Sequence, residues 1–140
     1  MIKQELSSYL SGLTNISSSI SKDIGPSYIE VDCFDKDNFK EEFCKYYNIS
    51  KDKLEYKESN RKLEDVLNEW LNNNELVNSL IYWIKLRIGE PIKVYETDDS
   101  NIEELISGYS NSISPFYITE EIVYVEFKDY IACFMIGNNE

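Results

Sequence analysis

The segment over residues 123–136 constrains the fold of this chain more than any other. From 123 to 127, apolar residues alternate with tyrosine and glutamate, the pattern of a strand with one buried face. The stretch over 130–136 is almost continuously apolar, which is typical of a central strand covered on both faces. Lys128 and Asp129 lie between the two runs and offer a tight turn. The sequence therefore predicts a C-terminal β-hairpin whose second strand lies inside a sheet.

Apolar residues near the N-terminus recur at steps of 4, 3, 4, 3 and 4, which places them on one face of a helix. They are Ile2, Leu6, Tyr9, Leu13, Ile16 and Ile20. The opposite side is rich in serine, a weak helix former, so packing must hold this helix. Those serines are Ser7, Ser8, Ser11, Ser18 and Ser21. Because Gly25-Pro26 ends the pattern, we expect an amphipathic helix over 1–24 before a core over 28–140. The apolar face fits packing on that core or, alternatively, a coiled-coil contact with a partner.

Alternation predicts a half-buried strand over 28–34, with Glu30 and Asp32 on its polar side. Asp35 and Asp37 then offer caps for a short helix over 39–47. Residues 49–60 are charged and weakly patterned, which predicts a loop, with a short strand at 54–56 as an alternative.

Two further helices are predicted as a helical hairpin. Asn60 offers a cap for the first, and Asn72-Asn73-Asn74 separates it from the second, over 76–88. Apolar residues occupy most of the circumference of the second helix, so we expect it to be the most buried one, with Trp83 in the interior.

The remaining pattern completes one α+β domain. A strand is predicted over 92–96, and Ser100 with Glu103 forms a capping box for a short helix. At 140 residues the chain has the usual size of a single domain. We therefore expect a mixed or antiparallel sheet of about 4–5 strands packed against about 4–5 helices.

Charge and composition exclude several classes of function. The chain carries 26 acidic residues, 14 basic residues and no histidine, which gives a net charge of −12. Imidazole, the side chain that most often does acid–base chemistry near neutral pH, is therefore missing. The excess of carboxylates disfavours direct binding to nucleic acid or an anionic membrane and favours a basic protein partner. Because nucleophile and phosphate-binding motifs are also missing, we expect a protein that is not an enzyme and needs no cofactor, with a histidine-free hydrolase as an alternative.

The cysteines and the chain's start bear on location. Cys33, Cys44 and Cys133 lie among apolar neighbours, as free thiols do in a reducing compartment. Neither a signal peptide nor a membrane-spanning apolar run is apparent, so we expect a cytoplasmic protein. The aspartates over 32–37 could hold a divalent cation, but they lack the glycine and the distal acid of a calcium loop. Helix capping is the favoured interpretation of these aspartates, and no metal site is predicted.

An acidic, tyrosine-rich surface is the remaining feature with functional content. Acidic side chains steer a basic partner, and tyrosines anchor it. The candidate partner-binding residues are Glu30, Asp32, Tyr95, Glu96, Asp98, Asp99, Glu103, Glu104, Tyr124 and Glu126. The alternative is an ordinary solvated surface with tyrosines at the edge of the core.

The chain resembles small acidic bacterial immunity proteins, which neutralise toxins. The resemblance rests on size, acidity, α+β layout, the lack of catalytic motifs and the final segment VYVEFKDYIACFMIGNNE. It implies tight binding over the active site of a toxin, often a basic nuclease. We expect the protein to be a monomer or a weak homodimer. Two alternatives stay open: an adaptor or oligomerisation module that uses the N-terminal helix, and a phage or mobile-element protein that mimics nucleic-acid charge.

Overall fold

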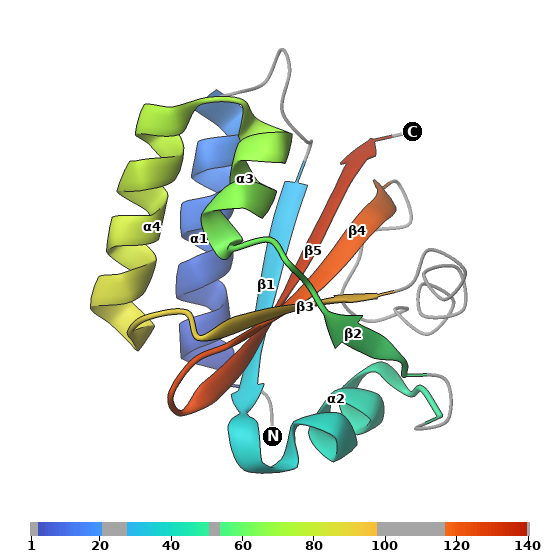
Figure 1. Cartoon of the computed structure of the whole chain (residues 1–140). Helices are drawn as coiled ribbons and strands as arrows, with labels where there is room; N and C mark the ends of the chain where they lie inside the picture. Colours follow the sequence, from blue (N-terminus) through green and yellow to red (C-terminus); the bar gives the residue numbers. More distant parts are fainter. Residues whose placement is uncertain (1–2, 21–27, 51–53, 98–116, 140) are drawn as a thin grey trace.

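The computed structural model describes residues 3–20, 28–50, 54–97 and 117–139. Its elements, in chain order, are α1 (Gln4–Ile20), β1 (Tyr28–Asp35), the 3-10 turn η1 (Lys36–Asn38), α2 (Phe39–Tyr47), β2 (Tyr56–Glu58), α3 (Leu63–Leu71), α4 (Asn74–Ile88), β3 (Lys93–Thr97), β4 (Tyr117–Glu126) and β5 (Tyr130–Asn139). The five strands form one antiparallel sheet in the order β1-β5-β4-β3-β2. Helices α1, α3 and α4 pack on one face, and α2 packs on the other (Figure 1). The predicted α+β fold is confirmed.

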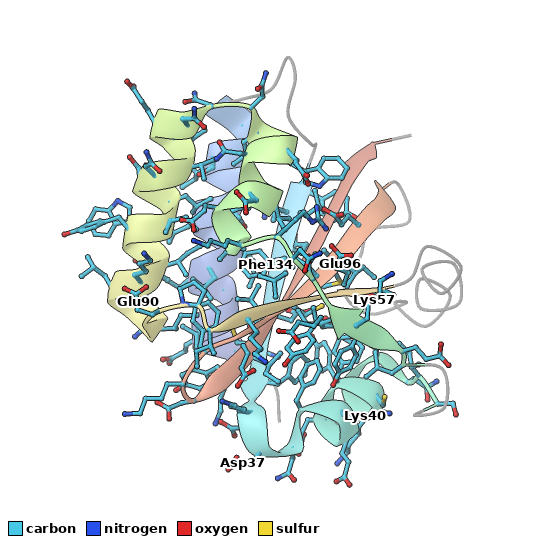
Figure 2. All side chains as sticks on the ribbon, viewed as in Figure 1. Asp37, Lys40, Lys57, Glu90, Glu96 and Phe134 are labelled. Atoms are coloured by element: carbon cyan, nitrogen blue, oxygen red, sulfur yellow. The ribbon has the colours of Figure 1, made fainter. Side chains whose placement is uncertain are left out.

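The C-terminal hairpin lies where the sequence predicts it. Strand β5 pairs with β1 on one side and with β4 on the other, and Val125 lies opposite Ala132 across the hairpin. Alternate residues of β5 enter two different cores. Ala132 and Phe134, the latter labelled in Figure 2, pack under α1, α3 and α4. Cys133 and Met135 pack under α2. Both faces of β5 are therefore covered, which explains its continuously apolar sequence.

The helical hairpin of α3 and α4 is also present, with one boundary corrected. Asn60 does not cap α3, because the helix begins at Leu63 and Asp65 instead accepts the backbone N–H of Lys62 at 2.9 Å. Asn72 ends α3 in the left-handed region at φ 48°, a conformation that asparagine tolerates better than most residues. Asn73 then caps α4 by accepting the N–H of Leu76 at 3.1 Å.

Helix α4 is not buried around its circumference, and the prediction for Trp83 was wrong. Its buried face consists of Val77, Leu80, Ile81 and Ile84. Trp83 is 48% exposed, because a helix that packs on one side of a sheet turns its opposite face to solvent. An apolar sequence around a whole helix therefore marks an uncovered surface here and not a central helix.

Helix α1 lies along the free edge of β1, and two of its serines, Ser7 and Ser11, face that edge. In an antiparallel edge strand, alternate residues point both their N–H and their C=O outward. Helix α1 binds these groups with hydroxyl and amide side chains that recur every three to four residues along the helix. The strand residues that they bind are two apart. The bonds join Ser7 Oγ to Cys33 N (2.8 Å), Ser11 Oγ to Val31 N (2.8 Å) and O (2.9 Å), Thr14 Oγ1 to Ile29 O (2.6 Å), and Asn15 Oδ1 to Ile29 N (3.0 Å).

This arrangement corrects the predicted face of α1. Leu6 and Leu10 are buried, but Tyr9 and Ile16 are 39% and 64% exposed. The side that approaches the sheet is partly polar because it carries the hydrogen bonds to β1. No helix among the described residues is long and apolar enough to cross a membrane.

Smaller predictions shift or fall outside the described residues. Strand β2 is displaced from the expected 54–56, and β3 is displaced by one residue from 92–96. Asp35 precedes η1 without a side-chain capping bond and instead pairs with Lys3 at 3.1 Å. Asp37 lies within η1 and not at the cap of α2, which falls at Asn38. The capping box at Ser100 lies outside the described residues.

Candidate functional site

The sheet separates the predicted partner-binding residues. Asp98, Asp99, Glu103 and Glu104 lie outside the described residues. Of the six others, five belong to the face that packs under α2, because residues at even steps along a strand share a face. These are Glu30, Asp32, Tyr95, Tyr124 and Glu126. Glu96, on the opposite face, belongs to a different cluster.

Asp32 lies under α2 and not on an exposed surface. The hydroxyl of Tyr47, from α2, donates a hydrogen bond to its carboxylate. Burial, reinforced by the nearby charge of Glu30, raises the pKa of Asp32 to about 7. Glu30 is half-buried on the same strand. The carboxylate of Asp32 therefore acts within the fold, between β1 and α2.

Tyr124 is a core residue. Its side chain is 0% exposed, and its ring lies 5.6 Å from the ring of Phe39 and 5.6 Å from that of Phe43. Burial raises the pKa of Tyr124 well above its ordinary value. An anchor that reaches into a partner must be accessible, so Tyr124 contributes a wall and not a projecting side chain.

Tyr95, Tyr124 and Glu126 nevertheless meet at one pocket, which we call the aromatic pocket. It has a volume of about 260 Å³ and lies on the α2 face of the sheet. Its lining residues are Lys36, Phe39, Tyr56, Tyr95, Tyr124, Glu126 and Ile131. They come from η1, α2, β2, β3, β4 and β5, so α2, η1 and four of the five strands position them.

Glu126 is the carboxylate of the aromatic pocket. Lys36 forms an ion pair with its Oε2, and the Tyr95 hydroxyl donates to its Oε1 at 3.4 Å. Partial burial, and then the charge of Glu126, raise the pKa of Tyr95. Tyr56, 37% exposed, brings its ring within 5.5 Å of the Tyr95 ring. The pocket thus combines aromatic rings with one negative charge held by a lysine.

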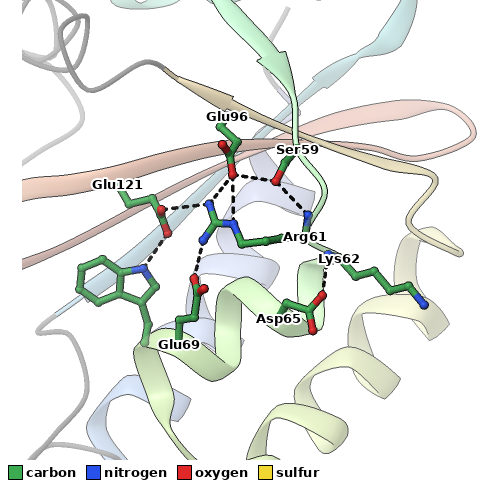
Figure 3. Close-up of polar contacts among 8 residues, drawn as sticks. Ser59, Arg61, Lys62, Asp65, Glu69, Glu96 and Glu121 are labelled. Carbon is green, nitrogen blue, oxygen red and sulfur yellow. Dashed lines mark hydrogen bonds and ion pairs between the residues drawn. The ribbon is translucent and has the colours of Figure 1, made fainter.

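Glu96 is engaged by Arg61 on the other face (Figure 3). The guanidinium donates to Glu96 Oε2 from Nε at 3.0 Å and from Nη2 at 2.7 Å, and the Ser59 hydroxyl donates to the same oxygen at 2.6 Å. The Ser59 hydroxyl lowers the pKa of Glu96, and Arg61 adds to this effect. Glu96 is therefore held within the fold.

Two more carboxylates complete the cluster around Arg61. Its Nη2 lies 3.2 Å from Glu121 Oε2, and its Nη1 pairs with Glu69. The indole N–H of Trp70 donates to Glu121 Oε1 at 2.7 Å. Although partial burial opposes its charge, these carboxylates hold the pKa of Arg61 above its usual range. The cluster fastens the segment before α3 to β3, β4 and α3, which is a structural role.

Exposed apolar side chains on α1 and α4 form a second surface feature, here called the α1–α4 patch. It consists of Tyr9, Tyr82, Trp83 and Leu86. The rings of Tyr82 and Trp83 lie 5.6 Å apart, and the Arg87 guanidinium lies 5.5 Å from the Tyr9 ring, which links the two helices. The sequence held a signal for this patch: Tyr82 and Leu86, four residues apart, lie opposite the buried face of α4.

The cysteines and the possible metal ligands among the described residues bear on nucleophilic and metal chemistry. All three cysteines are buried, and burial raises the pKa of Cys33 to about 12, so its thiol stays protonated. Within the described ranges, no three histidine, cysteine, aspartate or glutamate side chains converge as metal ligands do.

Comparisons with protein-family models, with curated proteins and with solved structures find no match to this chain.

Proposed function

We propose that this protein is a non-catalytic inhibitor of the immunity type, which binds a basic protein through the face that carries the aromatic pocket. The observation that carries the proposal is the pocket itself, where Tyr95, Tyr124 and Glu126 meet. Aromatic residues that surround a recess are typical of the anchoring points of protein interfaces. A basic toxin enzyme is the partner that the resemblance to immunity proteins implies.

Charge supports the choice of partner. With a net charge of −12, the chain attracts a basic protein over distances of about one Debye length, roughly 8–10 Å at physiological salt. Such attraction raises the association rate, whereas the buried contacts at the anchor set the lifetime of the complex. The overall charge therefore governs the association rate, and the aromatic pocket governs the lifetime of the complex.

Binding to a basic protein encoded by a neighbouring gene tests the proposal. Titration calorimetry at about 50 mM and about 300 mM salt should give one-to-one binding that weakens as salt rises. Tyr95→Ala should weaken binding by at least about tenfold, as loss of an interface anchor does. Tyr82→Ala is the matched control on the other side of the sheet, and it should change the affinity by less than about twofold. Binding that is unaffected by Tyr95→Ala would contradict the placement of the interface.

The α1–α4 patch favours a second candidate, an adaptor or oligomerisation module. Contiguous exposed apolar side chains often mark an interaction surface. Here Trp83 and Leu86 are 48% and 61% exposed. If Tyr82→Ala weakens binding and Tyr95→Ala does not, this second function replaces the first.

A further inference from the structure

The aromatic pocket has walls that suit a cation. The Tyr56 ring lies 5.2 Å from the Tyr124 ring, 5.5 Å from the Tyr95 ring and 6.3 Å from the Phe39 ring. The plane of the Tyr56 ring is inclined by 47° to that of Tyr124, by 75° to that of Tyr95 and by 70° to that of Phe39. The face of an aromatic ring is the negative end of its quadrupole and attracts ammonium and guanidinium groups within about 6 Å.

The only carboxylate in the described lining already holds a cation. Glu126 has a side chain that is 19% exposed, and the Lys36 ammonium pairs with it. Lys36 itself is 35% exposed, and its backbone N–H donates to the carbonyl of Asp129 at 3.2 Å. The backbone of Lys36 is therefore fixed, while its long side chain ends at the edge of the pocket. A cation from outside would compete with this lysine for the same carboxylate.

The size of the pocket limits its occupant to a single side chain. Small-molecule sites commonly measure about 300–1,000 Å³, and this pocket, at about 260 Å³, is smaller. Tyr56, at 37% exposure, leaves it accessible from solvent. One guanidinium or ammonium group on a methylene stem matches both the volume and the lining, since the stem contacts ring carbons and the charge faces Glu126.

We propose that the aromatic pocket receives a guanidinium or ammonium group from a side chain of the basic partner, and that Lys36 competes with it for Glu126. The source of the cation rests on the proposed function, but the preference of the pocket for a cation does not. Loss of Lys36 should therefore tighten binding, whereas loss of the charge of Glu126 should weaken it. A purely apolar pocket would respond to neither change.

The test uses small probes and needs no protein partner. Protein labelled in its tyrosine rings is titrated with N-acetylarginine amide and N-acetyllysine amide, and the ring resonances of Tyr56 and Tyr95 are followed by NMR. N-acetylcitrulline amide, a neutral molecule of nearly the same shape as the arginine probe, is the control ligand. We expect saturable shifts with a charged probe and none with the citrulline probe.

Two variants sharpen the result. Lys36→Gln should lower the Kd of the arginine probe by about threefold to tenfold, and Glu126→Gln should raise it by a similar factor. Lys85→Gln on α4 removes one positive charge, as Lys36→Gln does, and should leave the Kd of the arginine probe unchanged. Equal shifts with citrulline, or no saturable shift in Lys36→Gln protein, would overturn the proposal. Because the partner is absent, a failure here leaves the calorimetric test of the proposed function intact.

Discussion

Asp32 shows how a single residue links this fold to pH. It is mostly buried beneath Tyr47, and burial raises its pKa to about 7, compared with about 3.9 in an unfolded chain. Between these two values the folded protein keeps a proton that the unfolded chain has released. The stability contributed by the protonated carboxyl is therefore full below about pH 4 and is lost as the pH rises through about 7.

Asp32→Asn should remove this dependence of stability on pH. In the native protein, Asp32 should lower the free energy of unfolding by about 2–3 kcal/mol between pH 5 and pH 8, and the variant should lack that loss because an amide does not ionise. Urea unfolding of both proteins at the two pH values measures the difference. Asp37→Asn, at an exposed aspartate, is the control and should keep the native slope. Equal slopes in native and Asp32→Asn protein would show that Asp32 does not titrate as described.

At the scale of elements, the pairing of α1 with β1 follows from matching repeats. Four residues of a helix rise about 6.0 Å, and two residues of a strand extend about 6.6–6.8 Å. Ser7 and Ser11 therefore meet Cys33 and Val31 in step, and Thr14 continues the series at Ile29. The short hydroxyl side chains allow the close approach that these hydrogen bonds require.

Ser11→Ala should be costly and Ser8→Ala should not. Ser11 accepts the N–H of Val31 and donates to its carbonyl, so the alanine variant leaves two backbone groups at the strand edge without partners. We expect Ser11→Ala to destabilise the protein by about 1–3 kcal/mol. Ser8 is exposed on the same helix, and Ser8→Ala should lower the free energy of unfolding by less than about 0.5 kcal/mol. Both substitutions change the helix propensity equally. Urea denaturation measures both, and equal losses would contradict a specific role for Ser11.

The elements differ in how far sequence predicts them. Strand β5 was predictable because both of its faces pack in apolar cores, which gives it a continuously apolar sequence. Periodicity failed for α1, where Ser7 and Thr14 are buried through hydrogen bonds to the edge of β1, which an apolar pattern does not report. It also failed for Asp32 and Tyr124: alternation indicates which residues share a face, but it does not indicate which element covers that face, here α2.

For the whole molecule, like charges oppose the compact state. With a net charge of −12, added salt should stabilise the fold by screening repulsion, and the melting temperature should rise by a few degrees between about 20 mM and about 500 mM NaCl. Thermal unfolding by circular dichroism measures this. A melting temperature that falls with salt would instead mean that specific pairs, such as those of Arg61, outweigh the general repulsion.

The covered edge of β1 also sets a limit on assembly. Fibril growth by strand addition needs a molecule that can accept a neighbour at both ends of its sheet. Here α1 occupies one end, and β2 forms the other. Two copies joined through β2 would present only helix-covered ends to a third copy. Strand addition would therefore stop at a dimer. The serine-rich helix α1 would in this way also prevent further polymerisation.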